Sequence, residues 1–259
     1  MPKIPQKYHA IDNENTIIQA QPVTTPLSTE FTILGSETSR PTRKKFISRV
    51  YSILWVQLVV TSFFIGCCNQ IQPLQTFMKS DWGSTILLPC MLLYLILSCL
   101  PICNHDIVRK CPGSGIYLVL FTITMTYIVG YIGLAYSLST LLLAGLSTIG
   151  IFSGLTLYAI QTRYDYTDKG GYLIGALLGF ILFGFFISFT QYQFTSIIYA
   201  SMGSVIFSFY IVYDTQLIVG GNHKKIVFHT DDYALAAVSL YVDIINLFLM
   251  IVELLNGRN

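Results

Sequence analysis

Two acidic residues lie inside long apolar runs near the C-terminal end of the sequence. Asp214 lies in the run SIIYASMGSVIFSFYIVYDTQLIVGG, and Asp243 lies in the run YALAAVSLYVDIINLFLMIVELL. Both runs are long enough to cross a bilayer as helices. A carboxylate at the centre of a span costs about 2.5 kcal/mol or more on insertion scales, and such residues usually have a function. We therefore interpret Asp214 and Asp243 as groups that handle a proton, a cation, or both.

The chemistry available to these acids depends on whether they meet. Two carboxylates that approach each other in a low-dielectric interior cannot easily both ionise, so their titrations are coupled. At higher pH the charged pair either separates or attracts a cation, and Ca²⁺ prefers carboxylate and carbonyl oxygens. The sequence therefore predicts a pH-sensitive cation gate, with Asp214 and Asp243 as candidate calcium ligands. The alternative is a pair that shares a proton, or bonds to tyrosine, only to hold the helices together.

A simple residue count places the two acids at different depths. Asp214 lies six residues before Gly220, or about 9 Å along a helix. Asp243 lies thirteen residues after Thr230, where a helix cap is predicted, which corresponds to roughly 20 Å. A tilted helix, or a sixth span that runs past Gly220, would be needed to bring the carboxyl groups together.

The last apolar run has one small and polar face. Asp243 shares this face with residues spaced three and four apart: Ala236, Ser239, Asn246, Met250 and Glu253. In lipid, a polar stripe must turn toward protein partners or water, which predicts that this helix is central. We expect Ser239 and Asn246 to support the acids, together with Tyr213 and Tyr241, which lie beside them in the sequence.

The composition identifies the class of protein that positions these residues. The 259-residue chain is 53% hydrophobic and 11% charged, and its mean hydropathy is +0.62. Soluble domains contain about 25% charged residues, so the composition predicts an all-α polytopic membrane protein. Seven apolar segments are each long enough to span, at about 46–68, 84–103, 116–136, 139–161, 171–190, 195–219 and 232–255.

The segment before the first span is polar and differs from the rest of the chain. Residues 1–45 contain five of the nine prolines, which predicts a disordered tail followed by a seven-helix domain over 46–259. With seven spans, 13 of the 15 basic residues fall on one side of the membrane, which favours a cytoplasmic N-terminus. Within the domain, Gly171, Gly175 and Gly179 recur every four residues and predict a close helix contact.

No enzyme motif is found in the chain. It lacks a phosphate-binding loop, a dinucleotide fingerprint after a strand, a zinc-protease motif and a serine-hydrolase motif. We therefore expect no enzymatic activity, no cofactor and no nucleic-acid partner. The expected partners are the lipid bilayer and the ions, calcium or protons, that the acids would handle.

Two C-terminal segments carry a family resemblance. FSFYIVYDTQLIVGGNHK, followed by DDYALAAVSLYVDIINLFLMIVELL, resembles the signature of the Bax inhibitor-1 family and most of all its Lifeguard branch. FISRVYSILWVQLVVTSFF and YAIQTRYDYTDKGGYL are similar to that family as well, so the resemblance covers about residues 46–255.

The resemblance implies a fold and a function. It implies seven helices with the last surrounded by the other six, a pH-dependent calcium leak from internal stores, and suppression of cell death through regulatory proteins. The family's di-acidic sensor corresponds to Asp214 and Asp243. Some members also have a basic residue that bonds one acid, and Arg109 and Lys110 are the candidates for this latch here. The family occupies endoplasmic reticulum and Golgi membranes, which are the favoured location, and also the plasma membrane.

Two other functions compete with the leak. One is a non-conducting membrane adaptor that modulates cell-death or stress partners through its tail and cytoplasmic loops. The other is a seven-helix receptor, which the very short predicted outer loops at 137–138 and 191–194 disfavour, because they leave little surface for a ligand.

Overall fold

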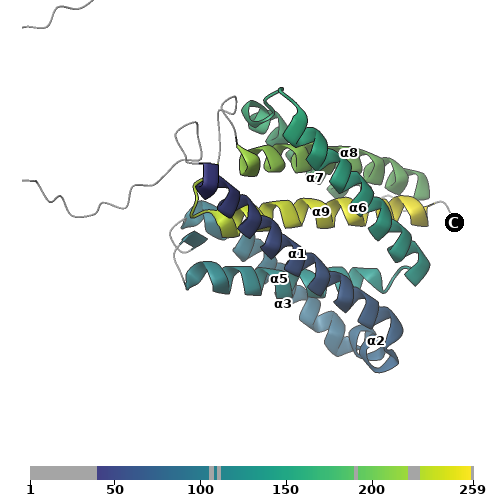
Figure 1. The fold of residues 1–259 in the computed structure, drawn as a ribbon. Coiled ribbons are helices and arrows are strands. Elements are labelled where there is room, and N and C mark those ends of the chain that lie inside the picture. The colour runs from purple at the N-terminus through teal and green to yellow at the C-terminus, as the bar shows by residue number, and fades with distance from the viewer. Residues whose placement is uncertain (1–39, 105–107, 110–111, 190–191, 221–227, 258–259) are drawn as a thin grey trace, which may run out of the picture. The chain divides into compact units, whose positions relative to one another are not determined.

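A computed structural model describes residues 40–104, 108–109, 112–189, 192–220 and 228–257. Every element in this part is a helix, and seven of the helices are long and apolar enough to cross a membrane, which confirms the predicted fold class. In chain order, the elements are α1 (Arg40–Gln70), α2 (Gln72–Lys79), α3 (Asp81–Cys103), α5 (Gly113–Gly133), α6 (Leu138–Gln161), the 3₁₀ turn η1 (Thr167–Lys169), α7 (Gly170–Ile187), α8 (Gln193–Val219) and α9 (Tyr233–Asn256) (Figure 1).

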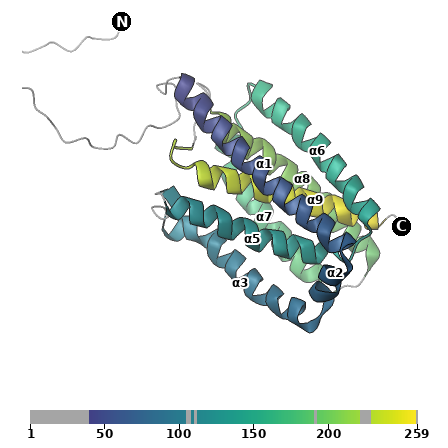
Figure 2. The same ribbon diagram turned by 60° about the horizontal axis from the view of Figure 1, so that its bottom comes forward.

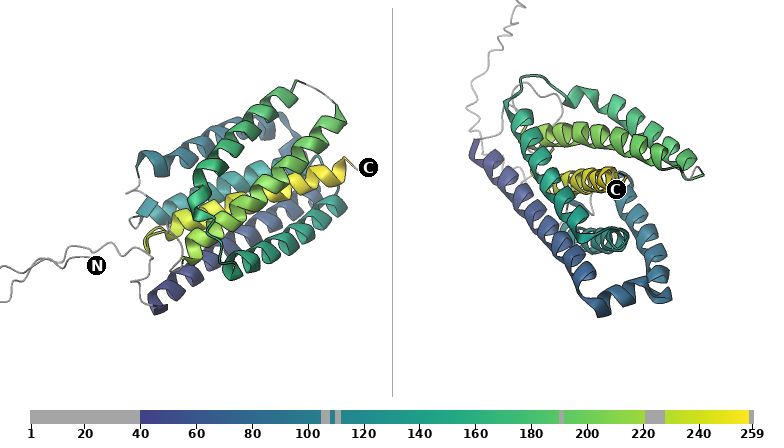
Figure 3. Two further views of the ribbon diagram at one scale, coloured as in Figure 1. Left: turned by 90° about the horizontal axis from the view of Figure 1, so that it is seen from above. Right: turned by 90° about the vertical axis from the view of Figure 1, so that its right-hand side faces the viewer.

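Helix α9 is the centre of the bundle, as predicted. It packs against α1, α5, α6 and α8, and the right-hand view of Figure 3 looks almost along it, with the other helices around it. In the apolar stretch of α9, 61% of the residues are buried, compared with 6% in the apolar stretch of the span that contains α7. Alanines 234, 236 and 237 are fully buried near its start, and small side chains of this kind let neighbouring helices approach closely.

The first helix begins earlier than the predicted span. It starts at Arg40, so residues 40–45, assigned to the tail from the sequence, belong to α1. Residues 1–39, the rest of the predicted tail, lie outside the described part. After α1, the short helix α2 was not predicted; it contacts both α1 and α3 and carries the chain from one to the other (Figure 2).

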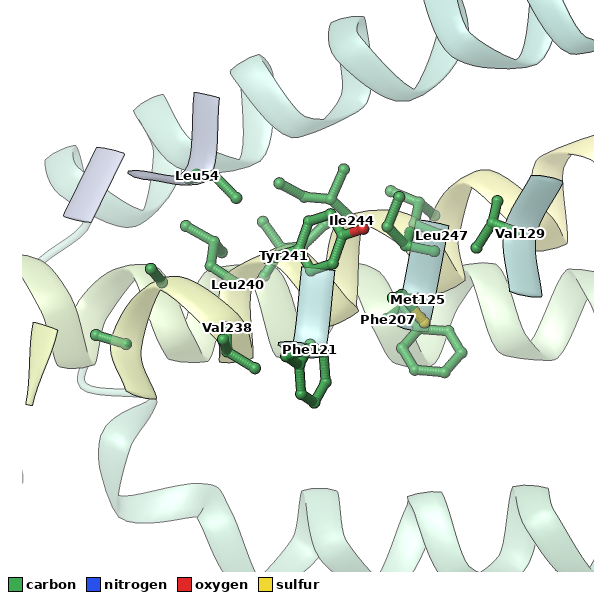
Figure 4. Close-up of a cluster of buried hydrophobic side chains, with 14 of the residues drawn as sticks. Leu54, Phe121, Met125, Val129, Phe207, Val238, Leu240, Tyr241, Ile244 and Leu247 are labelled. Carbon is green, nitrogen blue, oxygen red and sulfur yellow. The ribbon is translucent and has the colours of Figure 1, made fainter. Parts of the chain in front are cut away.

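Large apolar side chains fill the space around α9. Figure 4 shows residues of α9 meeting side chains from α1, α5 and α8: Leu54, Phe121, Met125, Val129, Phe207, Val238, Leu240, Tyr241, Ile244 and Leu247. Because lipid tails are as apolar as these side chains, the bundle gains its stability from close packing and from interhelical hydrogen bonds.

The predicted glycine face does not make a helix contact. Gly171, Gly175 and Gly179 are exposed on α7, and a methyl group added at any of them would meet nothing within 4 Å. Helix α7 instead turns Phe180 inward, where its ring stacks on Tyr199 of α8 at 4.1 Å. The three glycines share one face of α7, as their spacing indicates, but this face is exposed and does not pack against another helix.

Close contact involves another glycine. A methyl group added at Gly203 of α8 would lie 2.5 Å from Met250 Sδ of α9 and 2.6 Å from Phe180 Cζ of α7. Gly203 therefore lets three helices meet, because any larger side chain would require the neighbours to move.

Candidate functional site

The structure brings the two intramembrane acids together. Helices α8 and α9 are consecutive spans that pack along much of their length. Asp214 and Asp243 are 7% and 6% exposed, and their carboxyl groups lie within hydrogen-bonding reach of each other. Asp243 Oδ2 is buried and has no hydrogen-bond partner among the described residues. The site is thus a contact between two acidic side chains deep in the bundle.

The depth mismatch is resolved by where the two helices end. Asp214 lies five residues before the end of α8, and Asp243 lies ten residues after the start of α9. Helix α9 begins beyond the end of α8 (Figure 1), because residues 228–232 lead the chain outward before the helix starts. Gly220 terminates α8 with φ of 59°, a conformation that favours glycine. The offset between the helix ends compensates for the extra residues before Asp243.

Two tyrosines that the sequence reasoning missed lie close to the acids. Tyr210 is one helical turn before Asp214 and lies within electrostatic range of both carboxyl groups. Tyr94, from α3, lies within electrostatic range of Asp243. The four-residue spacing from Asp214 could have identified Tyr210. Nothing in the sequence near Tyr94 points to Asp243.

Three of the four predicted supporting residues make contacts elsewhere. Tyr213 lies within electrostatic range of Asp214, and its hydroxyl packs against Gly170 at the start of α7. Tyr241 is two residues from Asp243, about 200° around the helix, and therefore faces the opposite side. Asn246 donates from Nδ2 to the Val242 carbonyl of its own helix at 2.9 Å.

Ser239 is half-buried on α9. It shares the Asp243 face of the helix, and its support of the acids stays a prediction.

Tyr241 belongs to a second polar cluster, between α1, α5 and α9. Its hydroxyl lies 2.7 Å from Thr61 Oγ1, which in turn lies 2.9 Å from Thr126 Oγ1. One turn earlier, Gln57 Nε2 donates to Thr122 Oγ1 at 2.9 Å. In a membrane interior, polar groups must find partners inside the protein, so this hydroxyl cluster ties the central helix to two of its neighbours.

Gln216, two residues after Asp214, holds the segment between α6 and α7. Its Oε1 accepts from the Tyr166 N–H at 2.8 Å, and its Nε2 donates to the Tyr164 carbonyl at 3.0 Å. The side chain is 1% exposed. Since Gln216 and Asp214 belong to the same turn of α8, the position of the acid is coupled to that of this loop.

The predicted basic latch pairs with a different acid. Arg109 Nε and Nη2 donate to Asp232 Oδ1 and Oδ2, at 2.5 and 3.0 Å. Asp232 Oδ2 also accepts from the His229 N–H at 3.2 Å. Asp232 lies eleven residues before Asp243, or about 16 Å along the chain, so Arg109 does not latch the acid pair. Lys110, the other candidate, lies outside the described residues.

The first turn of α9 is held by a second cation and a hydroxyl. Arg49 of α1 lies 3.6 Å from the centre of the Tyr233 ring, and the Tyr233 hydroxyl lies 2.8 Å from Ser114 Oγ of α5. Together with the Arg109–Asp232 pair, these contacts form what we call the α9 clamp: Arg49, Arg109, Ser114, Asp232 and Tyr233.

At its other end, α9 is tied to the turn between α5 and α6. The Tyr136 hydroxyl donates to Glu253 Oε2 at 2.8 Å. Burial, followed by this contact with Glu253, raises the pKa of Tyr136 above its ordinary value. Glu253 is therefore held by the protein and does not simply face the membrane interface.

The pair of acids could contribute only part of a metal site. Among the described residues, no group of three or more His, Cys, Asp or Glu side chains converges. Ca²⁺ takes six to eight oxygen ligands, so two carboxylates alone do not form a calcium cage.

Comparisons with known proteins give the family. The family model described as "Inhibitor of apoptosis-promoting Bax1" matches residues 43–259. The chain is 30% identical to human Protein lifeguard 3 over 87% of its own length and 72% of that protein. It is 31% identical to Protein LIFEGUARD 2 of Arabidopsis thaliana, over 83% of its own length and 88% of the relative's. With these matches and seven membrane-spanning helices, the chain belongs to the Bax inhibitor-1 family, in its Lifeguard branch.

Proposed function

We propose that this protein is a pH-sensitive calcium leak of an internal membrane, gated by Asp214 and Asp243. The observation that carries the proposal is the contact of these two buried carboxyl groups at the meeting of α8 with the central helix. Carboxyl groups inside a membrane are costly. Apolar side chains of similar size could fill the same space without loss of stability, so packing alone does not explain why two carboxyl groups lie here.

The pair has two states that differ in charge. While the two carboxyl groups share a proton, they attract each other and hold α8 against α9. When that proton is lost, two negative charges remain in a medium that screens them poorly, so they must separate or be neutralised by a cation. Each outcome changes the contact between α8 and the central helix, and a divalent cation is the more effective neutralising ion.

Among the described residues, the ion pair that forms is Arg109–Asp232 and none involves Asp214 or Asp243, which supports this reading. Arg109, the candidate from the sequence, is bonded to Asp232 at the start of α9. No lysine or arginine lies in the middle of any span. A permanent positive charge would hold the acids ionised at all physiological pH values, whereas a proton or a metal ion exchanges.

Membership in the family also suggests a role in cell death. The family model names an inhibitor of apoptosis-promoting Bax1, and we propose that this protein acts on the same process by setting the calcium content of its store. Endoplasmic reticulum or Golgi membrane is the proposed location.

Calcium efflux from liposomes tests the proposal. The full-length protein is reconstituted in vesicles that contain a calcium dye, and flux is measured from pH 5.5 to 8. We expect the wild type to show a flux that changes with pH, and Asp214→Asn and Asp243→Asn to show a flux that does not. Asp231→Asn is the matched control, because this acid is exposed beside α9 and should leave the pH profile unchanged.

Two outcomes would count against the leak. A pH profile that is the same in wild type and in both variants would exclude the pair as the gate. If the wild type conducts nothing, while deletion of residues 1–39 removes a cellular effect on cell death, the protein is an adaptor that works through its N-terminal segment.

A further inference from the structure

Two apolar crevices flank the outer side of α8. The first lies between α6 and α8 and has a volume of about 360 Å³. The second lies between α8, α7 and η1 and has a volume of about 370 Å³. Tyr166 and Phe209 line both crevices, so the two spaces meet at one end and are separated elsewhere by α8.

Both crevices open toward the membrane and have mostly apolar walls. Val205 and Phe209, on the outer face of α8, are 57% and 47% exposed in the isolated chain. Leu247 of the central helix α9 also lines the first crevice. These spaces are in the span, so a chain of methylene groups from the bilayer is the material available to fill them.

The shared end of the crevices is polar. The Tyr166 hydroxyl lies 2.7 Å from that of Tyr158, which lines the first crevice. Lys169 lines the second crevice, and its Nζ lies 5.6 Å from the centre of the Tyr172 ring. Within the described part of the chain, the ion pair that forms is Arg109–Asp232, so the Lys169 ammonium is not held by a carboxylate there. Tyrosines and a lysine at a span end are typical of the level of lipid headgroups.

We propose that one diacyl glycerophospholipid straddles α8, with one acyl chain in each crevice and its phosphate at Lys169 beside Tyr166. Two apolar spaces that diverge from one cationic end match a molecule with two tails and one phosphate. A sterol or a single-chain lipid would fill one crevice only. Basic pockets between membrane helices are known as binding sites for lipid headgroups.

The acyl chain in the first crevice would touch the central helix. It would contact Leu247, which lies one helical turn after Asp243. The lipid therefore lies against the helix that carries one of the two acids, and its loss would let α6 and α8 close. The binding site itself does not depend on the proposed calcium leak, since it is built from other side chains.

Native mass spectrometry of the purified full-length protein in mild detergent tests the site. After delipidation, phosphatidylcholine or phosphatidylserine is added back, and the fraction carrying one lipid is measured. Ser208→Phe fills the first crevice and Ala176→Phe the second, whereas Ser201→Phe adds the same ring on α8 outside both crevices. Lys169→Gln removes the headgroup cation, with Lys44→Gln as its control on the exposed part of α1.

The proposal predicts that one lipid stays bound to the wild type and to both controls. Lys169→Gln should weaken binding by about tenfold, the value expected when a hydrogen bond to a charged group is lost, and each Phe variant at least as much. Equal binding of both lipids would identify the phosphate as the recognised group, and a preference for phosphatidylserine would add its carboxylate. Equal retention by crevice variants and controls would overturn the site.

Because a crevice variant could fail to fold, a second measurement uses the wild type alone. Phosphatidylcholine with a photoactivatable group at the end of one acyl chain is cross-linked in vesicles, and the labelled peptides are identified. The proposal predicts labelling concentrated on the parts of α6, α7 and α8 that line the two crevices. Labelling spread evenly over all lipid-facing helices would show annular lipid only and would contradict a specific site.

Discussion

The α9 clamp offers a quantitative test of how the central helix is held. Its main element is the pair formed by Arg109 and Asp232, whose side chains are 19% and 4% exposed. Exposed pairs contribute about 0–1 kcal/mol, whereas removing one partner of a buried pair costs about 3–5 kcal/mol. The clamp lies between these limits, with one member buried and the other partly exposed. We therefore expect Arg109→Gln to destabilise the protein by about 2 kcal/mol.

A double-mutant cycle separates this pair from other contacts of the same residues. Asp232 also accepts from the His229 N–H, so Asp232→Asn alone would report more than the loss of Arg109. Thermal unfolding in detergent is measured for wild type, Arg109→Gln, Asp232→Asn and the double variant. For a chain of this size, 2 kcal/mol corresponds to a fall in Tm of roughly 4–8 °C. The double variant should lose less than the sum of the single losses, because the second substitution removes a partner already lost.

The exposed neighbour Asp231 provides the matched control. Asp231→Asn removes the same charge beside the same helix end, and its Tm should stay within about 2 °C of the wild type because surface substitutions usually change stability by less than 0.5 kcal/mol. Strictly additive single variants, or an Arg109→Gln variant as stable as the control, would refute the claim that this pair holds α9.

Three further predictions concern packing and hydroxyl groups. Gly203→Ala should lower stability by about 1–3 kcal/mol through overpacking, whereas Gly175→Ala, in open space, should be neutral or stabilise its helix; thermal unfolding would reveal the opposite signs. Tyr241→Phe should cost about 0.5–1.5 kcal/mol in the same assay, and Tyr172→Phe, on an exposed tyrosine, nothing measurable. The folded-state pKa of Tyr136 is raised, so the tyrosine's contribution to the free energy of unfolding is present below its unfolded pKa of about 10 and is lost as the pH rises beyond that value. When the pH is raised from 9 to 11, the Tyr136→Phe variant should therefore lose less stability than the wild type.

The spans and the central helix could be predicted from the sequence because each depends on local pattern. The seven apolar segments have the length that a bilayer imposes, and the polar stripe through Asp243 correctly indicated the most buried of the spans. The start of α1 was misplaced because residues 40–45 are polar and still helical. Composition reports where lipid begins, whereas a helix can continue past that point into water.

Side-chain partners could not be predicted, because they depend on which helices become neighbours. Arg109 was a candidate for the acid pair, but the fold places it on Asp232. Tyr241 was assigned to the face of Asp243, but Thr61, 180 residues earlier, satisfies its hydroxyl. The Gly175 face was assigned to a helix contact, but it lies on the outside. In each case the residue type was informative, and the direction in which it points was set by tertiary packing.

The central claim is that Asp214 and Asp243 act as one unit in gating. Calcium efflux from liposomes, measured against pH for both single Asp→Asn variants and the double variant, tests it most directly. If the two carboxyl groups share one proton and face one ion, removing either should abolish the pH dependence, and the double variant should resemble each single one. Two separate effects that accumulate in the double variant would show that the acids act independently and would contradict the account.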